Sequence, residues 1–172
     1  MSPLPLTAYR QRMCSTKRAA STRAYKAPME NSNNLLPRNP HQTVILLVDD
    51  DVMVLNIARI TLENAGYFVL TAENGQEALL LSRQYPGEIH LLLSDVTMPK
   101  LTGVELSKRI AVERPTTRIL LMSGTPDEAM AEPRFAFLHK PFTVHRLSAA
   151  VKKFLDGPAP SSRVRGPGIA SV

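Results

Sequence analysis

The stretch Ile89–Gly103, IHLLLSDVTMPKLTG, decides the fold of this chain. It opens with a short run that is apolar except for His90, Ile89–Leu93, which is typical of a strand buried on both faces in a parallel sheet. Asp95 comes just after this run. Ligands of an open parallel sheet bind beyond the carboxyl ends of its strands. Asp95 is therefore a candidate functional residue, although a lone aspartate after a strand is more often a turn residue.

The rest of the chain between residues 43 and 156 alternates strand patterns with helix patterns. The other expected strands are Val44–Val48, Tyr67–Thr71, Ile119–Met122 and Phe135–His139. Four helices are expected from apolar residues at helical spacing. Their faces are Val54, Ala58, Leu62 and Ala65; Ala78, Leu81, Ser82 and Tyr85; Leu106 and Ile110; and Val144, Leu147, Val151 and Phe154. This alternation predicts one doubly wound α/β domain.

The two ends of the chain differ in composition from this domain. Residues 1–42 are polar, basic and rich in proline, and residues 157–172 are a Gly/Pro/Ser segment, so both are expected to be disordered tails flanking a domain at 43–156. The single cysteine, Cys14, excludes a disulfide framework and a cysteine-based zinc site. Neither a membrane span nor a secretory signal is found, so a cytoplasmic protein is expected.

The net charge of +6 suggests nucleic acid as a partner, but the charge is unevenly distributed. Residues 1–29 hold six Lys or Arg and no acid, whereas residues 43–157 hold twelve basic and fourteen acidic residues. The domain itself is slightly acidic, so the charge argues against nucleic-acid binding by it. Binding of nucleic acid through the basic tails stays open as an alternative.

Chemically useful side chains follow four of the five expected strands. Asp49, Asp50 and Asp51 come after the first, Asp95 after the third, Ser123 after the fourth and Lys140 after the fifth. Clustered carboxylates repel one another, and a hard cation such as Mg²⁺ relieves this with oxygen ligands. A hydroxyl and an ammonium suit phosphoryl oxygens, and aspartate is a known nucleophile toward phosphorus. The set predicts a carboxylate that becomes an aspartyl phosphate.

Each of these residues also has a simpler explanation. Asp51 is better read as a helix N-cap, and for Asp49 and Asp50 in isolation the two interpretations are even. Ser123 before Gly124 is by itself a turn, and Lys140 before Pro141 is by itself a surface lysine. Their occurrence together, each at its own strand end, favours a site.

Residues 43–156 resemble a response-regulator receiver domain, with the fold of the chemotaxis response regulator. LLVDDD resembles the acidic pair of that family, LLLSDVTMPKLTG its phosphorylation segment, LLMSG its switch hydroxyl and Lys140-Pro141-Phe142 its lysine with the following proline. The resemblance implies a flavodoxin-like five-stranded sheet of order 2-1-3-4-5. Its implied site residues are Asp95 as phosphoacceptor; Lys140 and Ser123 as catalytic residues; Ser123 and Phe137 as the switch; and Asp49, Asp50, Asp95 and the Thr97 backbone carbonyl as ligands of Mg²⁺.

The resemblance implies a two-component or phosphorelay signalling protein rather than an enzyme. A histidine kinase or a His-phosphotransfer protein is the expected donor, and an unidentified downstream protein the expected target. A phosphatase of the haloacid-dehalogenase type is the enzymatic alternative, with Asp49 and Asp51 as its motif; Met53 and the lack of an acidic pair after Lys140 weigh against it.

The chain departs from the receiver pattern at two places. Thr102 replaces the aspartate common before the loop glycine, and only 17 positions separate Ser123 from Lys140. The short spacing predicts a fourth helix of one or two turns near 126–132, between Pro126 and Pro133. Such a helix offers little surface for the usual receiver dimer, so a monomer is expected.

Overall fold

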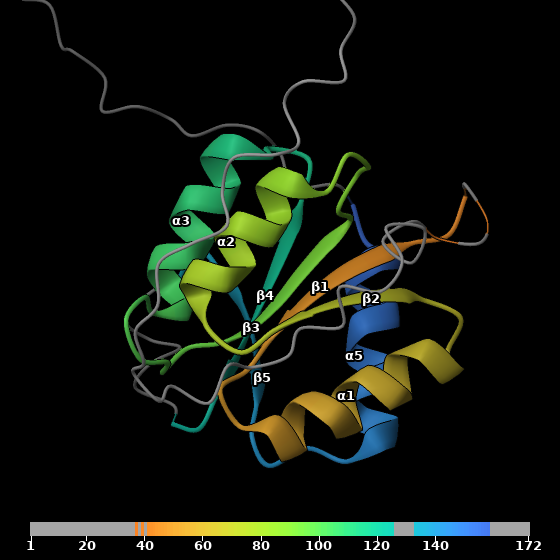
Figure 1. The fold of residues 1–172 in the computed structure, drawn as a ribbon. Helices are drawn as coiled ribbons and strands as arrows, with labels where there is room; N and C mark the ends of the chain where they lie inside the picture. Colours follow the sequence, from red (N-terminus) through yellow and green to blue (C-terminus); the bar gives the residue numbers. More distant parts are fainter. Residues whose placement is uncertain (1–36, 38, 40, 126–132, 159–172) are drawn as a thin grey trace, which may run out of the picture. The chain divides into compact units, whose positions relative to one another are not determined.

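The computed structural model describes residues 37, 39, 41–125 and 133–158 and contains five strands and four helices within them (Figure 1). The elements are β1 (Val44–Val48), α1 (Val52–Asn64), β2 (Phe68–Ala72), α2 (Gly75–Gln84), β3 (Leu91–Asp95), α3 (Gly103–Glu113), β4 (Arg118–Ser123), β5 (Ala136–His139) and α5 (Val144–Asp156).

The five strands form one parallel sheet in the order β2-β1-β3-β4-β5, which confirms the predicted fold class. Val48 pairs with both Ala72 and Ser94, and Ser123 pairs with His139, so the carboxyl ends of the strands share one edge of the sheet. The residues after these strands consequently converge, as the strand-end argument requires.

The sheet lies between two helical layers, with α2 and α3 on one face and α1 and α5 on the other (Figure 1). Side chains of β1 alternate between the layers because successive residues of a strand point to opposite faces. Ile45 and Leu47 join the core under α1 and α5, whereas Leu46 and Val48 join the core under α2 and α3. The strand is buried along its whole length, which explains its continuous apolar sequence.

Several element boundaries differ from the sequence prediction by one or two residues. β3 runs from Leu91 to Asp95 rather than from Ile89 to Leu93, because its register against β1 begins at Ile45 opposite Leu91. Ile89 is nevertheless fully buried, which is why it reads as part of the strand. Asp95 is thus the last residue of β3 and not a residue beyond it.

The predicted helix faces are correct in their centres and wrong at some of their ends. On α1, Ala58 and Leu62 are buried, but Val54 is only half-buried and Ala65 is exposed; Leu55 and Thr61 complete the buried face. Val144, which was predicted to lie on the inner face of the last helix, is 53% exposed.

The predicted fourth helix at 126–132 and most of both predicted tails lie outside the described residues. No helix among the described residues is both long and apolar enough to cross a bilayer.

Candidate functional site

Asp49, Asp95 and Lys140 meet at the carboxyl edge of the sheet. The Lys140 Nζ lies 2.7 Å from Asp49 Oδ2 and 2.6 Å from Asp95 Oδ1. Asp49 is 1% exposed and Asp95 is 7% exposed, so two carboxylates and one ammonium share a largely buried volume. The sequence prediction that these three residues converge is correct.

The three consecutive aspartates after β1 have different surroundings. Asp49 points into the site, and its Oδ1 accepts a hydrogen bond from the Asp51 backbone N–H at 3.0 Å. Asp51 is the N-cap of α1, where its Oδ1 accepts from the N–H groups of Met53 at 2.8 Å and Val54 at 3.3 Å. Asp50 lies between them and is exposed. The N-cap interpretation of Asp51 is therefore confirmed, and this role leaves its carboxylate poorly placed as part of a phosphatase motif.

The Asp95 carboxylate is oriented from both sides. Its Oδ2 accepts a hydrogen bond from the Thr97 backbone N–H at 3.0 Å, while Oδ1 faces Lys140. The chain after Asp95 is anchored in turn, because the Val96 N–H donates to the Met122 carbonyl at 3.0 Å. These contacts hold the Asp95 side chain in one orientation at the carboxyl end of β3.

Burial and the neighbouring charged side chains both shift the pKa values of Asp95 and Lys140. Burial raises the pKa of Asp95, as does the nearby Asp49, and the hydrogen bond and charge of Lys140 offset this only in part. Burial disfavours the charged form of Lys140, but hydrogen bonds and attraction from Asp49 and Asp95 outweigh it and raise the pKa of Lys140 overall. Lys140 is therefore a cation at neutral pH, and Asp95 holds a proton more tightly than an ordinary aspartate does.

The raised pKa of Asp95 predicts how the metal-free protein responds to pH. Folded Asp95 holds its proton more tightly than unfolded Asp95, so raising the pH from the ordinary carboxylate range through the raised pKa lowers the free energy of unfolding. In EDTA we expect this decline in the wild type and its absence in Asp95→Asn. Urea titrations of both proteins across that pH window measure the difference, and parallel curves would contradict it.

Ser123 and Phe137 lie on neighbouring strands behind this cluster. Ser123 is fully buried; its hydroxyl donates to the Thr125 carbonyl and accepts from the Thr125 N–H at 3.2 Å. The Lys140 N–H donates to the Ser123 carbonyl at 2.7 Å, which ties the end of β4 to the lysine. Phe137 is half-buried opposite Leu121 and points away from the layer of α1 and α5, where its neighbours Ala136 and Leu138 pack.

The donor set at this edge fits a magnesium ion by its chemistry. The Asp49 and Asp95 carboxylates lie on either side of one nitrogen atom, Asp50 is the next residue to Asp49, and the Thr97 carbonyl is two residues from Asp95. Carboxylate and carbonyl oxygens with several waters are the usual shell of Mg²⁺. In the part of the chain that the structure describes, no three His, Cys, Asp or Glu side chains already form a metal-holding group. The predicted ligands therefore stay a prediction.

The loop from Val96 to Thr102 contains residues whose roles the sequence analysis did not identify. A Cβ atom on Gly103 would lie 1.9 Å from the Asp95 carbonyl oxygen, so only glycine lets α3 start against the end of β3. Thr102, which departs from the receiver pattern, caps α3 in a capping box with Glu105. The Thr-x-x-Glu spacing is the signal that would have identified this role. The Lys140–Pro141 peptide is cis.

Comparison with known proteins finds a family model and relatives that match this chain. The model of the response regulator receiver domain matches residues 45–152. Sensor kinase CckA of Brucella abortus is 33% identical over 66% of this chain and 12% of its own length. The alkaline phosphatase synthesis transcriptional regulatory protein PhoP of Bacillus subtilis is 30% identical over 70% of this chain and 53% of its own length. The chain thus spans about half, or less, of these relatives.

Solved structures show the same fold. A response regulator receiver domain protein from Clostridium thermocellum has a TM-score of 0.59 at 30% identity, covering 66% of this chain and 94% of that one. The chemotaxis protein CheY4 of Vibrio cholerae also has a TM-score of 0.59 at 30% identity, covering 66% and 98%.

Proposed function

We propose that this chain, which belongs to the response regulator receiver domain family, accepts a phosphoryl group on Asp95 and signals by a change of surface. The observation that supports this is the placement of the Asp95 carboxylate, buried at the end of β3 and in contact with the Lys140 ammonium beside Asp49. This arrangement couples a nucleophilic oxygen to a cation that can neutralise an incoming phosphate.

The transfer follows from these positions. A carboxylate oxygen of Asp95 attacks phosphorus in line, and the bond between phosphorus and a histidine nitrogen of the donor breaks, its electron pair staying on that nitrogen. Lys140 donates hydrogen bonds to the phosphoryl oxygens, and Asp49 holds the lysine in place through its 2.7 Å contact. The Thr97 N–H keeps the Asp95 carboxylate oriented during the attack.

Mg²⁺ is the proposed cofactor, held by Asp50, Asp95 and the Thr97 carbonyl, with Asp49 contributing directly or through water. When bound it offsets the negative charge of the phosphoryl oxygens. Asp50 serves as a ligand that Lys140 does not engage, since the lysine contacts Asp49 and Asp95.

The surface change starts at Ser123. Its hydroxyl turns from Thr125 toward the new phosphoryl group, which releases the backbone of Thr125. Phe137, half-buried on the neighbouring strand, then repacks toward the space that this movement opens. The expected readout is a change near residues 124–134, most of which lie outside the described part of the chain.

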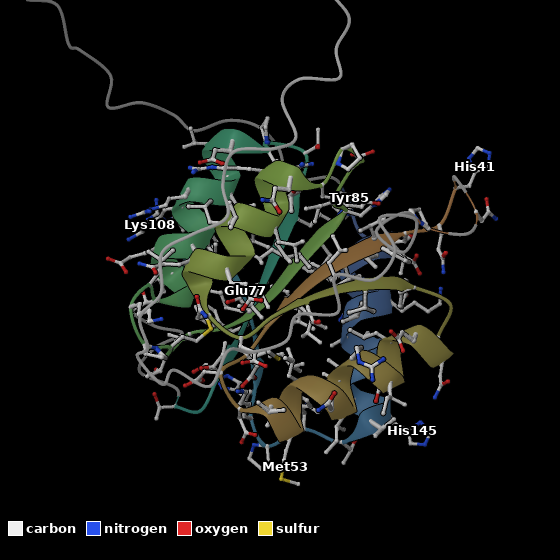
Figure 2. All side chains as sticks on the ribbon, viewed as in Figure 1. His41, Met53, Glu77, Tyr85, Lys108 and His145 are labelled. Carbon is white, nitrogen blue, oxygen red and sulfur yellow. The ribbon has the colours of Figure 1, made fainter. Side chains whose placement is uncertain are left out.

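The donor is a histidine kinase or a His-phosphotransfer protein, and α1 is its docking surface. Met53, Ile57 and Ile60 recur at helical spacing along α1 and are 73%, 54% and 50% exposed. Together with Val144 of α5, 53% exposed, they form the α1 docking surface, and Ile57, Ile60, Val144 and His145 line a hollow between the two helices. Figure 2 labels Met53 on α1 and His145 on α5. A downstream protein partner, a monomeric state, a cytoplasmic location and the lack of enzymatic activity are the further parts of this proposal.

Incubation with acetyl phosphate tests the cofactor. With Mg²⁺ present we expect one phosphate per chain by intact mass, and none with excess EDTA. Asp50→Ala should weaken Mg²⁺ binding by about tenfold and slow labelling in step, because one charged oxygen ligand is lost. Full labelling in EDTA, or an Asp50→Ala protein that binds Mg²⁺ like the wild type, would contradict the ligand set.

A further inference from the structure

The turn between β2 and α2 contacts two parts of the site, the acidic pair after β1 and the loop after Asp95. No candidate site residue was identified in this turn from the sequence. At one end, the Ala72 carbonyl accepts a hydrogen bond from the Asp49 N–H at 3.3 Å. At the other end, Gly75 packs against the loop that follows Asp95: a Cβ atom on Gly75 would lie 2.6 Å from the Leu101 carbonyl oxygen and 2.9 Å from the Leu101 Cβ. The turn thus bridges the acidic pair and the loop that carries Thr97.

This loop is short and tied at several points. Its start is bound to β4 through Val96, and the Gly103 N–H donates back to the Val96 carbonyl at 2.9 Å. Leu101 is 4% exposed in the core under α2 and α3, and its N–H donates to the Pro99 carbonyl at 2.9 Å. Lys100 takes a positive φ of 71° to make this turn. We expect a displacement of Leu101 to be passed along the loop toward Thr97, because these hydrogen bonds hold both ends of the loop.

The Leu101 backbone lies so close to Gly75 that no side chain fits between them. Ordinary van der Waals contact of a Cβ atom begins at 3.4 Å, so a methyl group on Gly75 forces the Leu101 carbonyl, or the first turn of α2, to retreat. The atom in the way is backbone and not the end of a flexible side chain, so rotation about a side-chain bond cannot relieve the clash.

We propose that Gly75 is a positioning residue of the phosphoacceptor site, which sets the place of the Thr97 backbone by letting Leu101 seat against α2. The proposal rests on the proposed function, since it assigns the Thr97 carbonyl to Mg²⁺ and the Thr97 N–H to Asp95. It gives the β2–α2 turn a role in metal affinity although none of its side chains belongs to the ligand set.

The test compares Gly75→Ala with Gly66→Ala in the full-length chain. Gly66 has a φ of 92°, and a Cβ atom added there would have no atom within 4 Å, so alanine strains the backbone without pressing on any neighbour, far from the site. It controls for lost stability. In EDTA, we expect the Thr97 amide to exchange hydrogen at least several-fold faster in Gly75→Ala and at the wild-type rate in Gly66→Ala.

With metal, Gly75→Ala should raise the dissociation constant of Mg²⁺ at least about threefold, since a misplaced carbonyl ligand binds a small octahedral cation poorly. Labelling by acetyl phosphate should fall most at low Mg²⁺ and recover toward the wild-type rate at saturating Mg²⁺. Gly66→Ala should match the wild type in both measurements. Equal behaviour of the two alanine variants, in amide exchange and in Mg²⁺ binding, overturns the proposal.

A second pair of variants approaches the same contact from the loop and applies even if Gly75→Ala does not fold. Leu101→Ala loosens the loop, whereas Leu106→Ala removes a fully buried leucine of the same core from α3. We expect weaker Mg²⁺ binding in Leu101→Ala only; equal Mg²⁺ affinity in both overturns the proposal. Failure of the proposed function has a separate signature, because the wild type itself would then take up no phosphate on Asp95.

Discussion

We expect Asp95→Asn to take up no phosphate from acetyl phosphate in the presence of Mg²⁺, whereas the wild type should gain one phosphate per chain. The amide that replaces the carboxylate has no anionic oxygen to attack phosphorus and cannot form the acyl phosphate. Asparagine has nearly the shape of aspartate, so it can still accept the Thr97 N–H and keep its place at the end of β3. The loss is therefore chemical and not structural.

Asp51→Asn is the matched control for this experiment. Asp51 lies near the same edge but caps α1, and asparagine is an equally good N-cap. We expect Asp51→Asn to be labelled at the wild-type rate. Labelling that survives in Asp95→Asn and is lost in Asp51→Asn would instead favour the phosphatase hypothesis, whose motif includes Asp51.

The convergence of the site could be predicted from sequence because it depends on topology alone. Once Val44–Val48 and the other apolar runs are taken as parallel strands, their carboxyl ends must share an edge, and Asp49, Asp95 and Lys140 follow there. Purely structural roles, such as capping a helix, could also be predicted for single residues. Asp51 as an N-cap is an example, because its sequence position before an apolar helical period carries that information.

The parts that could not be predicted depend on contacts between distant segments. The start of β3 at Leu91 is set by register with β1 and not by hydrophobicity, since Ile89 is buried as well. The need for glycine at position 75 comes from the Leu101 carbonyl, 26 positions along the chain, and no local pattern encodes that approach. Residues that act through backbone packing are therefore beyond the reach of local sequence patterns, unlike the cap at Thr102, which has a sequence signal.

Under the proposed function, a protein donor must dock on the α1 docking surface, whereas a small donor such as acetyl phosphate need not. The two kinds of phosphate donor can therefore be distinguished by changing that surface. The α1 docking surface begins at Met53, two residues after the N-cap Asp51, and runs along α1 away from the edge of the sheet where Asp95 lies. Acetyl phosphate reaches Asp95 without contacting this surface. Under the proposed function, a phosphohistidine of a donor protein reaches Asp95 only when that protein docks on α1.

The second large effect is therefore expected in a double variant, Ile57→Asp with Ile60→Asp. Both side chains are about half exposed, at 54% and 50%, so the substitutions place charges in solvent and leave the buried face of α1 intact. We expect transfer from a phosphorylated His-phosphotransfer protein or histidine kinase to slow by about thirtyfold or more, the size of a lost central apolar contact. Labelling by acetyl phosphate should stay at the wild-type rate.

Val112→Asp provides the matched control, because Val112 is an exposed apolar residue, 81% exposed, on α3 in the opposite helical layer. It introduces one aspartate, where the double variant introduces two, at an exposed apolar position, and it should leave both reactions unchanged. If the double variant slowed both donors equally, the substitutions would be disturbing the site itself. If Val112→Asp slowed protein transfer and the double variant did not, the donor would dock on the layer of α2 and α3, and the assignment of the α1 docking surface would be wrong.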